Sequence, residues 1–256
     1  MGKSLIFNNI SEEKINIGEI PSIIFRPKDI SGLLPTIIFY HGWSSNKELQ
    51  RFRGFILGSL GYQVIIPEAI YHGERDKIDH WANDSLKYFW PVIFNNLKES
   101  DLIIDYAIKS LNSDPDRIGV TGHSMGGFTA GGVFTHNKSI KALVVFNGSC
   151  DWGFSNKIFK KGINIPSSRY VKEMEEGINM LDPMNNMSSL INRPILLLHG
   201  GSDTVVSIEP QRNFYKKIFP LYVDNSKIKF IDYPNINHAV TTNMMEEAAI
   251  WFSKFL

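Results

Sequence analysis

Short apolar runs alternate with longer amphipathic segments along most of the chain. Runs rich in isoleucine, valine, leucine and phenylalanine, bounded by proline or glycine, predict strands. Runs without polar alternation are typical of parallel strands that are covered on both faces of a sheet. The strands predicted in this way span residues 22–26, 36–40, 62–66, 118–121, 143–146, 195–198 and 227–233.

Apolar residues three and four positions apart predict helices between these strands. We expect a buried helical stripe in residues 85–111 that includes Leu86 and Phe89, and Pro91 is expected to kink this segment or to begin a second helix. Helical spacing is also present over residues 47–60, 207–219 and 243–256. Strands that alternate with helices predict an α/β fold, with a mostly parallel central sheet flanked by helices and a ligand site at the carboxyl ends of the strands.

The region 151–190 departs from this alternation, because glycine and proline are scattered there among short helical patches. We interpret it as a small cap inserted over the site. The whole chain, residues 1–256, is then expected to form a single domain.

Composition and charge narrow the possible function classes. The 43% of hydrophobic and 21% of charged residues are typical of globular proteins. Lysine plus arginine number 27 and aspartate plus glutamate 26, so the formal net charge of +1 attracts neither nucleic acid nor an acidic membrane surface. Cys150 is the only cysteine, which excludes an intrachain disulfide and a cysteine zinc site; we expect it to act as a small apolar residue.

The N-terminal segment predicts a cytoplasmic location. Residues 1–7 contain too short an apolar run for the core of a secretory signal. No apolar run approaches the roughly 18 residues that a membrane span needs.

Residues 122–127 read GHSMGG and lie between a predicted strand and a predicted helix. They match the G-x-S-x-G pattern, in which a serine sits on a sharp strand-to-helix turn. Flanking glycines permit this turn, because a Cβ at their positions would collide with the neighbouring strand and helix. The motif predicts that Ser124 is a nucleophile, and an ordinary glycine-rich turn is the alternative.

A serine hydroxyl needs a neutral imidazole to accept its proton and a carboxylate to orient that imidazole. In folds with this turn the acid and then the histidine follow the serine along the chain. Asp203, after the strand 195–198, is the predicted acid; Asp151 is the competing candidate, and a helix cap is the alternative role for either. His238 is the predicted base, since it is the only one of seven histidines that follows Asp203.

Attack on an acyl carbon creates a negative oxygen, which two backbone N–H groups must stabilise. We expect one from Met125, directly after the nucleophile. The other is expected from Trp43, in the YHGW loop of residues 40–43 that follows a predicted strand.

The loop 71–76, together with Asp79 and His80, is dense in histidine and acidic residues. Its spacing matches none of the familiar metal-ligand sets, so no metal is predicted. A charged loop in which Arg75 pairs with a neighbouring acid is expected instead. Aromatic residues from Trp81 to Phe94 are expected in the core, with some of them lining an acyl pocket.

These residues resemble the α/β-hydrolase superfamily, and more narrowly its prolyl-oligopeptidase-like and dienelactone-hydrolase-like branch of small esterases. The likeness rests on YHGW at residues 40–43, YHGER at 71–75, the double glycine after Ser124, and the late Asp203 and His238. The chain is also similar to small bacterial carboxylesterases in which a segment like YFW, here residues 88–90, precedes a long helix. The resemblance implies a cofactor-free serine hydrolase that cleaves short-chain carboxylic esters through an acyl-enzyme on Ser124.

Two departures limit the resemblance. Dienelactone hydrolases have a cysteine nucleophile where this chain has Ser124, and 256 residues leave no room for the propeller domain of prolyl oligopeptidases. An acyl-CoA thioesterase, a peptidase or a perhydrolase on the same fold, or a binding protein without catalysis, are therefore the alternatives. The natural ester and the oligomeric state are not determined by the sequence.

Overall fold

An eight-stranded sheet forms the centre of the molecule in this computed structural model, which describes residues 9–28, 30–82, 84–162 and 169–256. The strand order is β1-β2-β4-β3-β5-β6-β7-β8, and all neighbours from β4 to β8 are parallel, whereas β1 and β2 are antiparallel additions. The strands are β1 (Ile10–Ile17), β2 (Ile20–Pro27), β3 (Leu34–Tyr40), β4 (Gln63–Pro67), β5 (Ser113–His123), β6 (Ala142–Phe146), β7 (Ile195–Gly200) and β8 (Ile228–Tyr233). The predicted α/β class with a mostly parallel sheet is confirmed.

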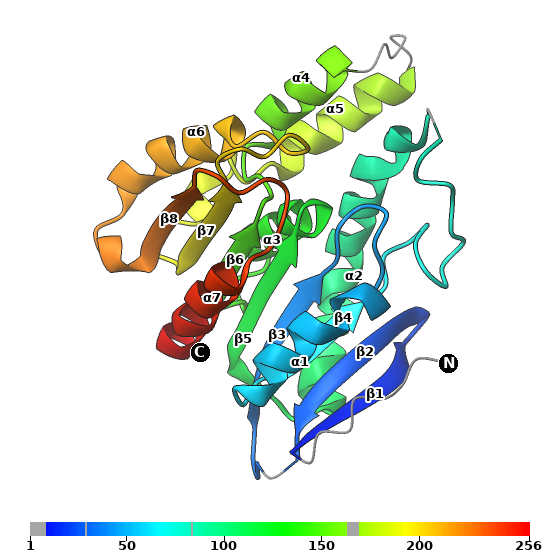
Figure 1. The fold of residues 1–256 in the computed structure, drawn as a ribbon, viewed down its shortest axis with the longest axis vertical. Helices are drawn as coiled ribbons and strands as arrows, with labels where there is room; N and C mark the ends of the chain where they lie inside the picture. Colours follow the sequence, from blue (N-terminus) through cyan, green and yellow to red (C-terminus); the bar gives the residue numbers. More distant parts are fainter. Residues whose placement is uncertain (1–8, 29, 83, 163–168) are drawn as a thin grey trace.

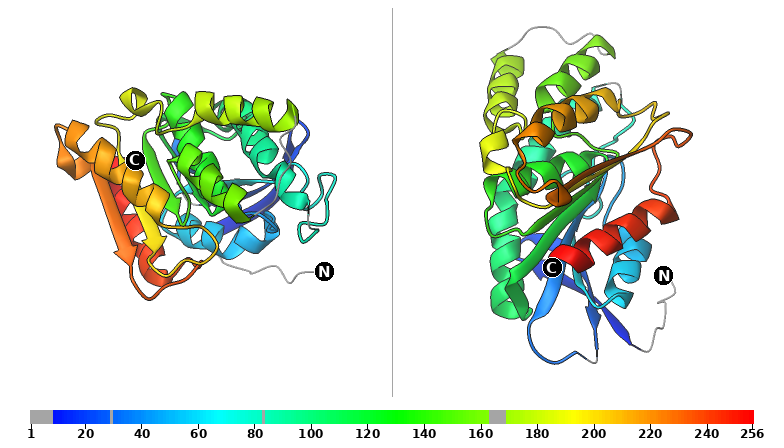
Figure 2. Two further views of the ribbon diagram at one scale, coloured as in Figure 1. Left: turned by 90° about the horizontal axis from the view of Figure 1, so that it is seen from above. Right: turned by 90° about the vertical axis from the view of Figure 1, so that its left-hand side faces the viewer.

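Helices cover both faces of this sheet (Figure 1). On one face lie α2 and α3, and on the other lie α1 and α7 (Figure 2). The helices are α1 (Arg51–Ser59), α2 (Phe89–Ser110), α3 (Met125–His136), α4 (Trp152–Gly162), α5 (Arg169–Leu181), α6 (Glu209–Ile218) and α7 (Thr242–Phe255).

The core is divided between the two faces because successive side chains of a strand point in opposite directions. In β3, Ile38 packs in the cluster that contains residues of α2, α3 and α6. Its neighbours Ile37 and Phe39 pack in the cluster that contains residues of α1 and α7. Continuous apolar strands are therefore buried on both sides, as their sequence predicts.

Each predicted strand is present, but β1 was not predicted. Its sequence, ISEEKINI, has three successive charged residues and is only partly buried. A strand at the edge of a sheet pairs on one side only and needs little apolar surface. Its apolar pattern is therefore weak, and it pairs with β2 through a tight turn at Gly18.

Pro91 begins a helix rather than kinking one. It lies in the first turn of α2, where the N–H that proline lacks would have no intrahelical partner. A separate 3₁₀ helix, Ser85–Tyr88, precedes α2. Leu86 lies on that 3₁₀ helix and is 44% exposed, so its predicted place in the buried stripe is wrong, because the 3₁₀ turn puts it out of phase with α2.

The aromatic segment 81–94 is also only partly core. Phe89 and Trp90 are buried, but Trp81 is 85% exposed, in the loop before the 3₁₀ helix, and the prediction is wrong for this residue. Cys150 is free and fully buried, as expected for a small apolar residue.

Between β6 and β7 the chain forms α4 and α5, which lie beyond the carboxyl ends of the parallel strands (Figure 1). Residues 163–168 of the predicted cap and the N-terminal residues 1–7 lie outside the described residues. Over the described part of the chain, no helix combines the length and the apolar content needed to cross a bilayer.

Candidate active site

Ser124 occupies the sharp turn between β5 and α3. Its φ of 57° and ψ of −123° are unusual for a residue other than glycine. The turn is held by hydrogen bonds on both sides: the Ser124 N–H donates to the carbonyl of Phe146 at 2.9 Å, and its own carbonyl accepts from the N–H groups of Gly127 and Phe128. The residue is 7% exposed at the carboxyl edge of the sheet.

Two glycines make this turn possible by their lack of a side chain. A Cβ on Gly126 would lie 2.0 Å from the carbonyl oxygen of Tyr40, and one on Gly122 would lie 2.1 Å from the carbonyl oxygen of Gly126. Both obstacles are backbone atoms, which cannot rotate away. A side chain at either glycine would therefore collide with the backbone, as the G-x-S-x-G pattern predicts.

Asp203 and His238 are in direct contact. Asp203 Oδ2 lies 2.7 Å from His238 Nδ1, and the other carboxylate oxygen accepts the N–H groups of Val205 and Val206, each at 2.8 Å. The imidazole must carry its proton on Nδ1 to donate to a carboxylate, which leaves Nε2 free to accept a proton from another group. This is the arrangement that a general base requires.

The electrostatic state of Asp203 follows from its surroundings. Burial raises the pKa of its carboxyl, but hydrogen bonds from His199, His238 and the Val206 N–H lower it more, so the pKa lies well below its usual range. The carboxylate is therefore ionised at neutral pH and orients the imidazole of His238.

Asp151, the competing acid, has a different role. One carboxylate oxygen accepts the N–H of Phe154 at 3.1 Å, and the other accepts from the side-chain amide of Asn213 at 2.6 Å. Asp151 thus caps the first turn of α4, which is the alternative that its sequence position suggested. Among the described residues its carboxylate makes no hydrogen bond or ion pair with a histidine, so the geometry favours Asp203.

His123 connects the serine turn to the histidine. Its ring packs against that of His238 with 4.7 Å between centroids and 36° between the ring planes, and the next residue is Ser124. Burial, with the nearby His238 and Arg53, lowers the pKa of His123 to about 3, so the ring is neutral. Among the described residues Ser124 Oγ has no hydrogen bond to His238, a contact that often tightens only when substrate binds.

The two expected oxyanion-binding groups border Ser124. The turn of residues 42–45 lies against the serine, since a Cβ on Gly42 would be 3.3 Å from Ser124 Cβ. This turn is closed by a bond from the Ser45 N–H to the Gly42 carbonyl, which does not use the N–H of Trp43. Met125 begins α3, where the first N–H groups have no acceptor within the helix.

His199 is a second partner of Asp203 that the sequence analysis missed. Its Nε2 lies 3.0 Å from the carbonyl oxygen of Val206 and 3.5 Å from Asp203 Oδ2, and its side chain is fully buried. A carbonyl only accepts, so Nε2 carries the proton and faces the carboxylate as well. Its position at the end of a strand, four residues before the acid, is the available signal, but the chain order of acid and then base does not indicate this contact.

The charged loop after β4 is tied to α2. Two guanidinium nitrogens of Arg75 donate to the carboxylate of Glu99 at 2.9 and 2.6 Å. The expected pairing of Arg75 with a neighbouring acid is confirmed.

Residues 56–255 match the prolyl oligopeptidase family. The chain belongs to this family. YitV of Bacillus subtilis (strain 168) is 30% identical over 256 residues, which cover 96% of this chain and 100% of YitV. The esterase YjfP of Escherichia coli (strain K12) is 25% identical over 257 residues, again 96% of this chain and 100% of the relative.

A solved structure supports the same conclusion about the fold. The crystal structure of TT1662 from Thermus thermophilus matches with a TM-score of 0.79 at 15% sequence identity. The match covers 96% of this chain and 97% of the TT1662 chain. The expected α/β-hydrolase fold is confirmed, and the prolyl oligopeptidase family membership makes this chain a hydrolase.

Proposed function

We propose that this member of the prolyl oligopeptidase family is a serine esterase that cleaves short-chain carboxylic esters. Ser124 is the nucleophile, His238 the base and Asp203 the acid that orients the base. The observation that carries the proposal is the 2.7 Å contact between Asp203 and His238, whose ring packs against that of His123, the residue before Ser124. The relative YjfP, which is named an esterase, supports an ester as substrate.

The reaction proceeds in two acyl-transfer steps. Ser124 Oγ attacks the ester carbonyl carbon while His238 Nε2 accepts the hydroxyl proton. The resulting oxyanion accepts hydrogen bonds from the N–H groups of Trp43 and Met125. Collapse of the intermediate breaks the C–O bond, the proton passes from His238 to the leaving alcohol, and water then releases the acid by the reverse route.

Large aromatic side chains beside the Trp43 turn support a short acyl group. The ring of Phe89 lies 6.1 Å from that of Trp43, and it packs edge-on against Phe128 and Phe159 at 5.5 and 5.4 Å. Closely packed rings leave little room for a long chain. The helices α4 and α5, at this end of the sheet, are proposed to form the cap over the substrate.

The test is hydrolysis of p-nitrophenyl esters from acetate to laurate by the wild type and by Ser124→Ala. We expect turnover on the shortest esters, and a fall of roughly 10⁴-fold or more in kcat for Ser124→Ala. Circular dichroism of both proteins controls for folding. Substantial turnover by a folded Ser124→Ala protein would contradict the proposal.

Peptide-bond cleavage is the second candidate, because the family that the chain matches is described by an oligopeptidase. Thioester and p-nitroanilide substrates are therefore measured beside the esters. A kcat/KM for an anilide that exceeds the value for the corresponding ester would assign the site to peptide substrates. Labelling of Ser124 by a fluorophosphonate distinguishes any of these enzymes from a binding protein.

A further inference from the structure

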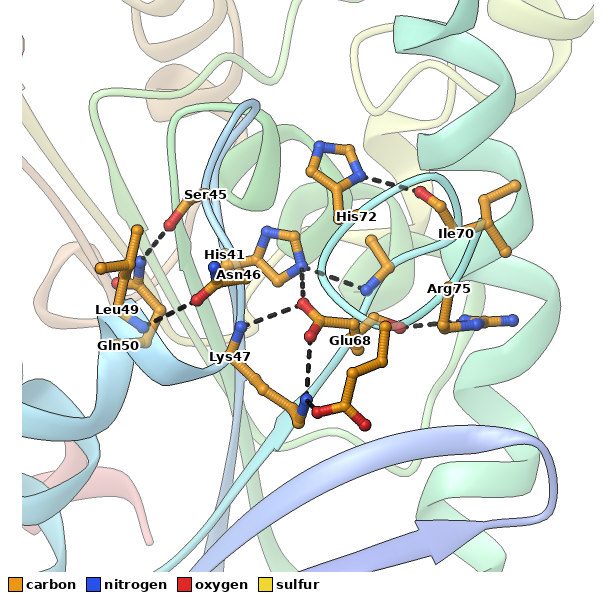
Figure 3. A network of polar contacts seen from close by, with 12 residues as sticks. His41, Ser45, Asn46, Lys47, Leu49, Gln50, Glu68, Ile70, His72 and Arg75 are labelled. Carbon is orange, nitrogen blue, oxygen red and sulfur yellow. Dashed lines mark hydrogen bonds and ion pairs between the residues drawn. The ribbon is translucent and has the colours of Figure 1, made fainter. Parts of the chain in front are cut away.

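A buried charged network joins Glu68 to Lys47, which follows the turn that carries Trp43 (Figure 3). Glu68 follows β4, and Lys47 follows the turn; their side chains are only 1% and 3% exposed. Lys47 Nζ lies 3.0 Å from Glu68 Oε2 and 2.6 Å from Glu74 Oε1. The acyl-transfer steps above use none of these groups, so the network needs another explanation.

The Glu68 carboxylate contacts both ends of the Trp43 loop, residues 41–47. The backbone N–H of Lys47 donates to Glu68 Oε1 at 3.0 Å. His41 Nδ1 donates to the Gly42 carbonyl at 2.9 Å, and Nε2 accepts the N–H of Ala69 at 3.1 Å. Nε2 therefore does not also donate to Glu68 Oε1, 3.2 Å away. The Glu68 carboxylate thus holds the Lys47 end of the loop (Figure 3), and the N–H of the next residue, Ala69, holds the His41 end.

The turn between these two anchors has an unfavourable backbone conformation. Ser44 has a φ of 58°, in the left-handed region that residues with a Cβ rarely adopt. Such a residue keeps its conformation only when the surrounding contacts determine it. The hydrogen bonds at the two ends of the loop, from the Lys47 N–H to Glu68 and from the Ala69 N–H to His41, supply such contacts.

The loop after Glu68 holds the same turn from the other side. The ring of Trp43 meets the rings of His80 and His72 edge-on, at centroid distances of 4.8 and 5.2 Å. Gly73 has a φ of +52°, and a Cβ there would lie 1.9 Å from Glu68 Oε2. This glycine lets the loop close over the carboxylate while His72 contacts Trp43.

Both charges of the buried pair are present at neutral pH. Burial raises the pKa of Glu68, but contacts with His41 and Lys47 outweigh it and lower the value to about 2. For Lys47, burial lowers the pKa, whereas hydrogen bonds to Glu74 and Glu68 raise it above its usual value. Hydrogen bonds between ionised groups away from water are strong and directional.

We propose that Glu68 is a positioning residue that holds the Trp43 N–H toward the oxyanion. It acts through the Lys47 N–H, and it does not touch the substrate. The inference rests on the proposed function, in which the Trp43 N–H stabilises the transition state. A group that only orients such a donor lowers kcat when it is removed and leaves ground-state binding nearly unchanged.

The test compares Glu68→Gln with Glu74→Gln on p-nitrophenyl acetate. Each substitution removes one carboxylate from Lys47, but Glu74 contacts only the Lys47 side chain among the described groups, so it is the matched control. We expect Glu68→Gln to lower kcat by about 10- to 100-fold with KM within about threefold, since loss of an oxyanion donor costs 10²- to 10³-fold. Glu74→Gln should stay within about twofold of the wild type.

A second readout is inhibition by phenylboronic acid, which forms a tetrahedral adduct on serine. Its Ki should rise for Glu68→Gln about as much as kcat falls, because both depend on the oxyanion site. Glu68→Asp, which retains the charge, should restore part of kcat. If Glu68→Gln does not fold, Glu68→Asp carries the test, because its shorter side chain withdraws the carboxylate from the Lys47 N–H and should lower kcat and raise the boronate Ki together.

Two results would overturn the inference, and they are distinguishable. An active wild type, with a folded Glu68→Gln variant whose kcat and boronate Ki are unchanged, would refute the role of Glu68 alone; where only Glu68→Asp folds, unchanged values for that variant would do so. A wild type without turnover on ester, thioester or anilide would refute the proposed function and this role with it.

Discussion

Asp203 Oδ2 and His238 Nδ1 lie 2.7 Å apart although 35 residues separate them along the chain. The contact follows from the sheet, because β7 and β8 are parallel neighbours and their last residues, Gly200 and Tyr233, are paired in register. The two loops that leave these strands begin at the same edge and meet. A backbone bond from the Ser202 N–H to the Ile236 carbonyl joins them again at 3.0 Å.

Replacing the acid should separate catalysis from stability. We expect Asp203→Asn to lower kcat by roughly 10³- to 10⁴-fold, because an amide no longer holds His238 in the tautomer that accepts a proton on Nε2. Asp151→Asn should retain kcat and lower the free energy of unfolding by at most about 1 kcal/mol, since Asp151 caps α4. Steady-state kinetics and urea unfolding of both variants measure this. The reverse pattern would assign the acid to Asp151.

Chain-length preference should respond to the aromatic residue beside Trp43. Phe89→Ala removes a large ring at the predicted acyl site, so the ratio of kcat/KM for octanoate to that for acetate should rise by about tenfold. The same change costs roughly 3–5 kcal/mol of folding free energy, as for any buried phenylalanine. Ester panels measured well below the unfolding temperature give the ratio.

Phe214→Ala is the matched control for this prediction. Phe214 lies on α6 and is fully buried, in a core cluster that does not include Trp43. It should destabilise the protein to a similar extent and leave the chain-length ratio unchanged. Equal ratios for the two variants would show that Phe89 does not limit the acyl group.

The turn of Ser124 should tolerate no side chain at Gly126. A Cβ there meets the Tyr40 carbonyl oxygen at 2.0 Å, so Gly126→Ala should destabilise the fold by at least about 3 kcal/mol or abolish it. Gly153→Ala is the control, because the nearest atom to a Cβ on that helical glycine is at 3.4 Å. Alanine in a helix should raise stability by up to about 1 kcal/mol there. Thermal unfolding of the two variants and the wild type measures these changes in stability.

Stability should fall as the pH is lowered from 6.5 toward 5. Burial is the main cause that lowers the pKa of both His72 and His123 from 6.5 to about 3, so the unfolded chain binds protons that the folded protein does not. Each histidine then reduces the free energy of unfolding by up to about 1.4 kcal/mol per pH unit below 6.5. Urea unfolding at pH 7, 6 and 5 measures the slope.

A single substitution tests the contribution of each histidine. His72→Phe removes one of the two titrations and should reduce the slope between pH 6 and 5 by roughly 1 kcal/mol per pH unit. His136→Phe, at the exposed end of α3, is the control. A slope that is the same in His72→Phe and in the wild type would show that His72 is not held neutral by the fold.

The fold and the central part of the candidate site could be predicted from the sequence, because both depend on patterns that the parallel sheet imposes. Ser124 and Asp203 follow strongly apolar strand segments, His238 follows the more polar strand β8, and parallel strands end at one edge. The glycines around Ser124 permit the close backbone contacts that this turn requires. Residue type and chain order were therefore sufficient to predict that Asp203 and His238 form a pair.

The remaining features depend on loop conformation, which has no period in the sequence. His199 faces Asp203 only because the loop after β7 turns back on its own strand. Glu68 and Lys47 meet across 21 residues, and neither residue's neighbours show that the other is buried. The exposure of Trp81 was missed for the same reason, since apolar content does not reveal which loop residues the core covers.

The edge strand β1 also affects how readily the sheet of this protein pairs with strands of other molecules. An unpaired sheet edge is a template on which a strand from another molecule can add and begin aggregation. Glu13 and Lys14 are exposed along this edge, and Glu12 is fixed by Arg51 of α1 through two N–H donors at 2.6 Å. A foreign strand would have to desolvate these charges, so the edge resists association.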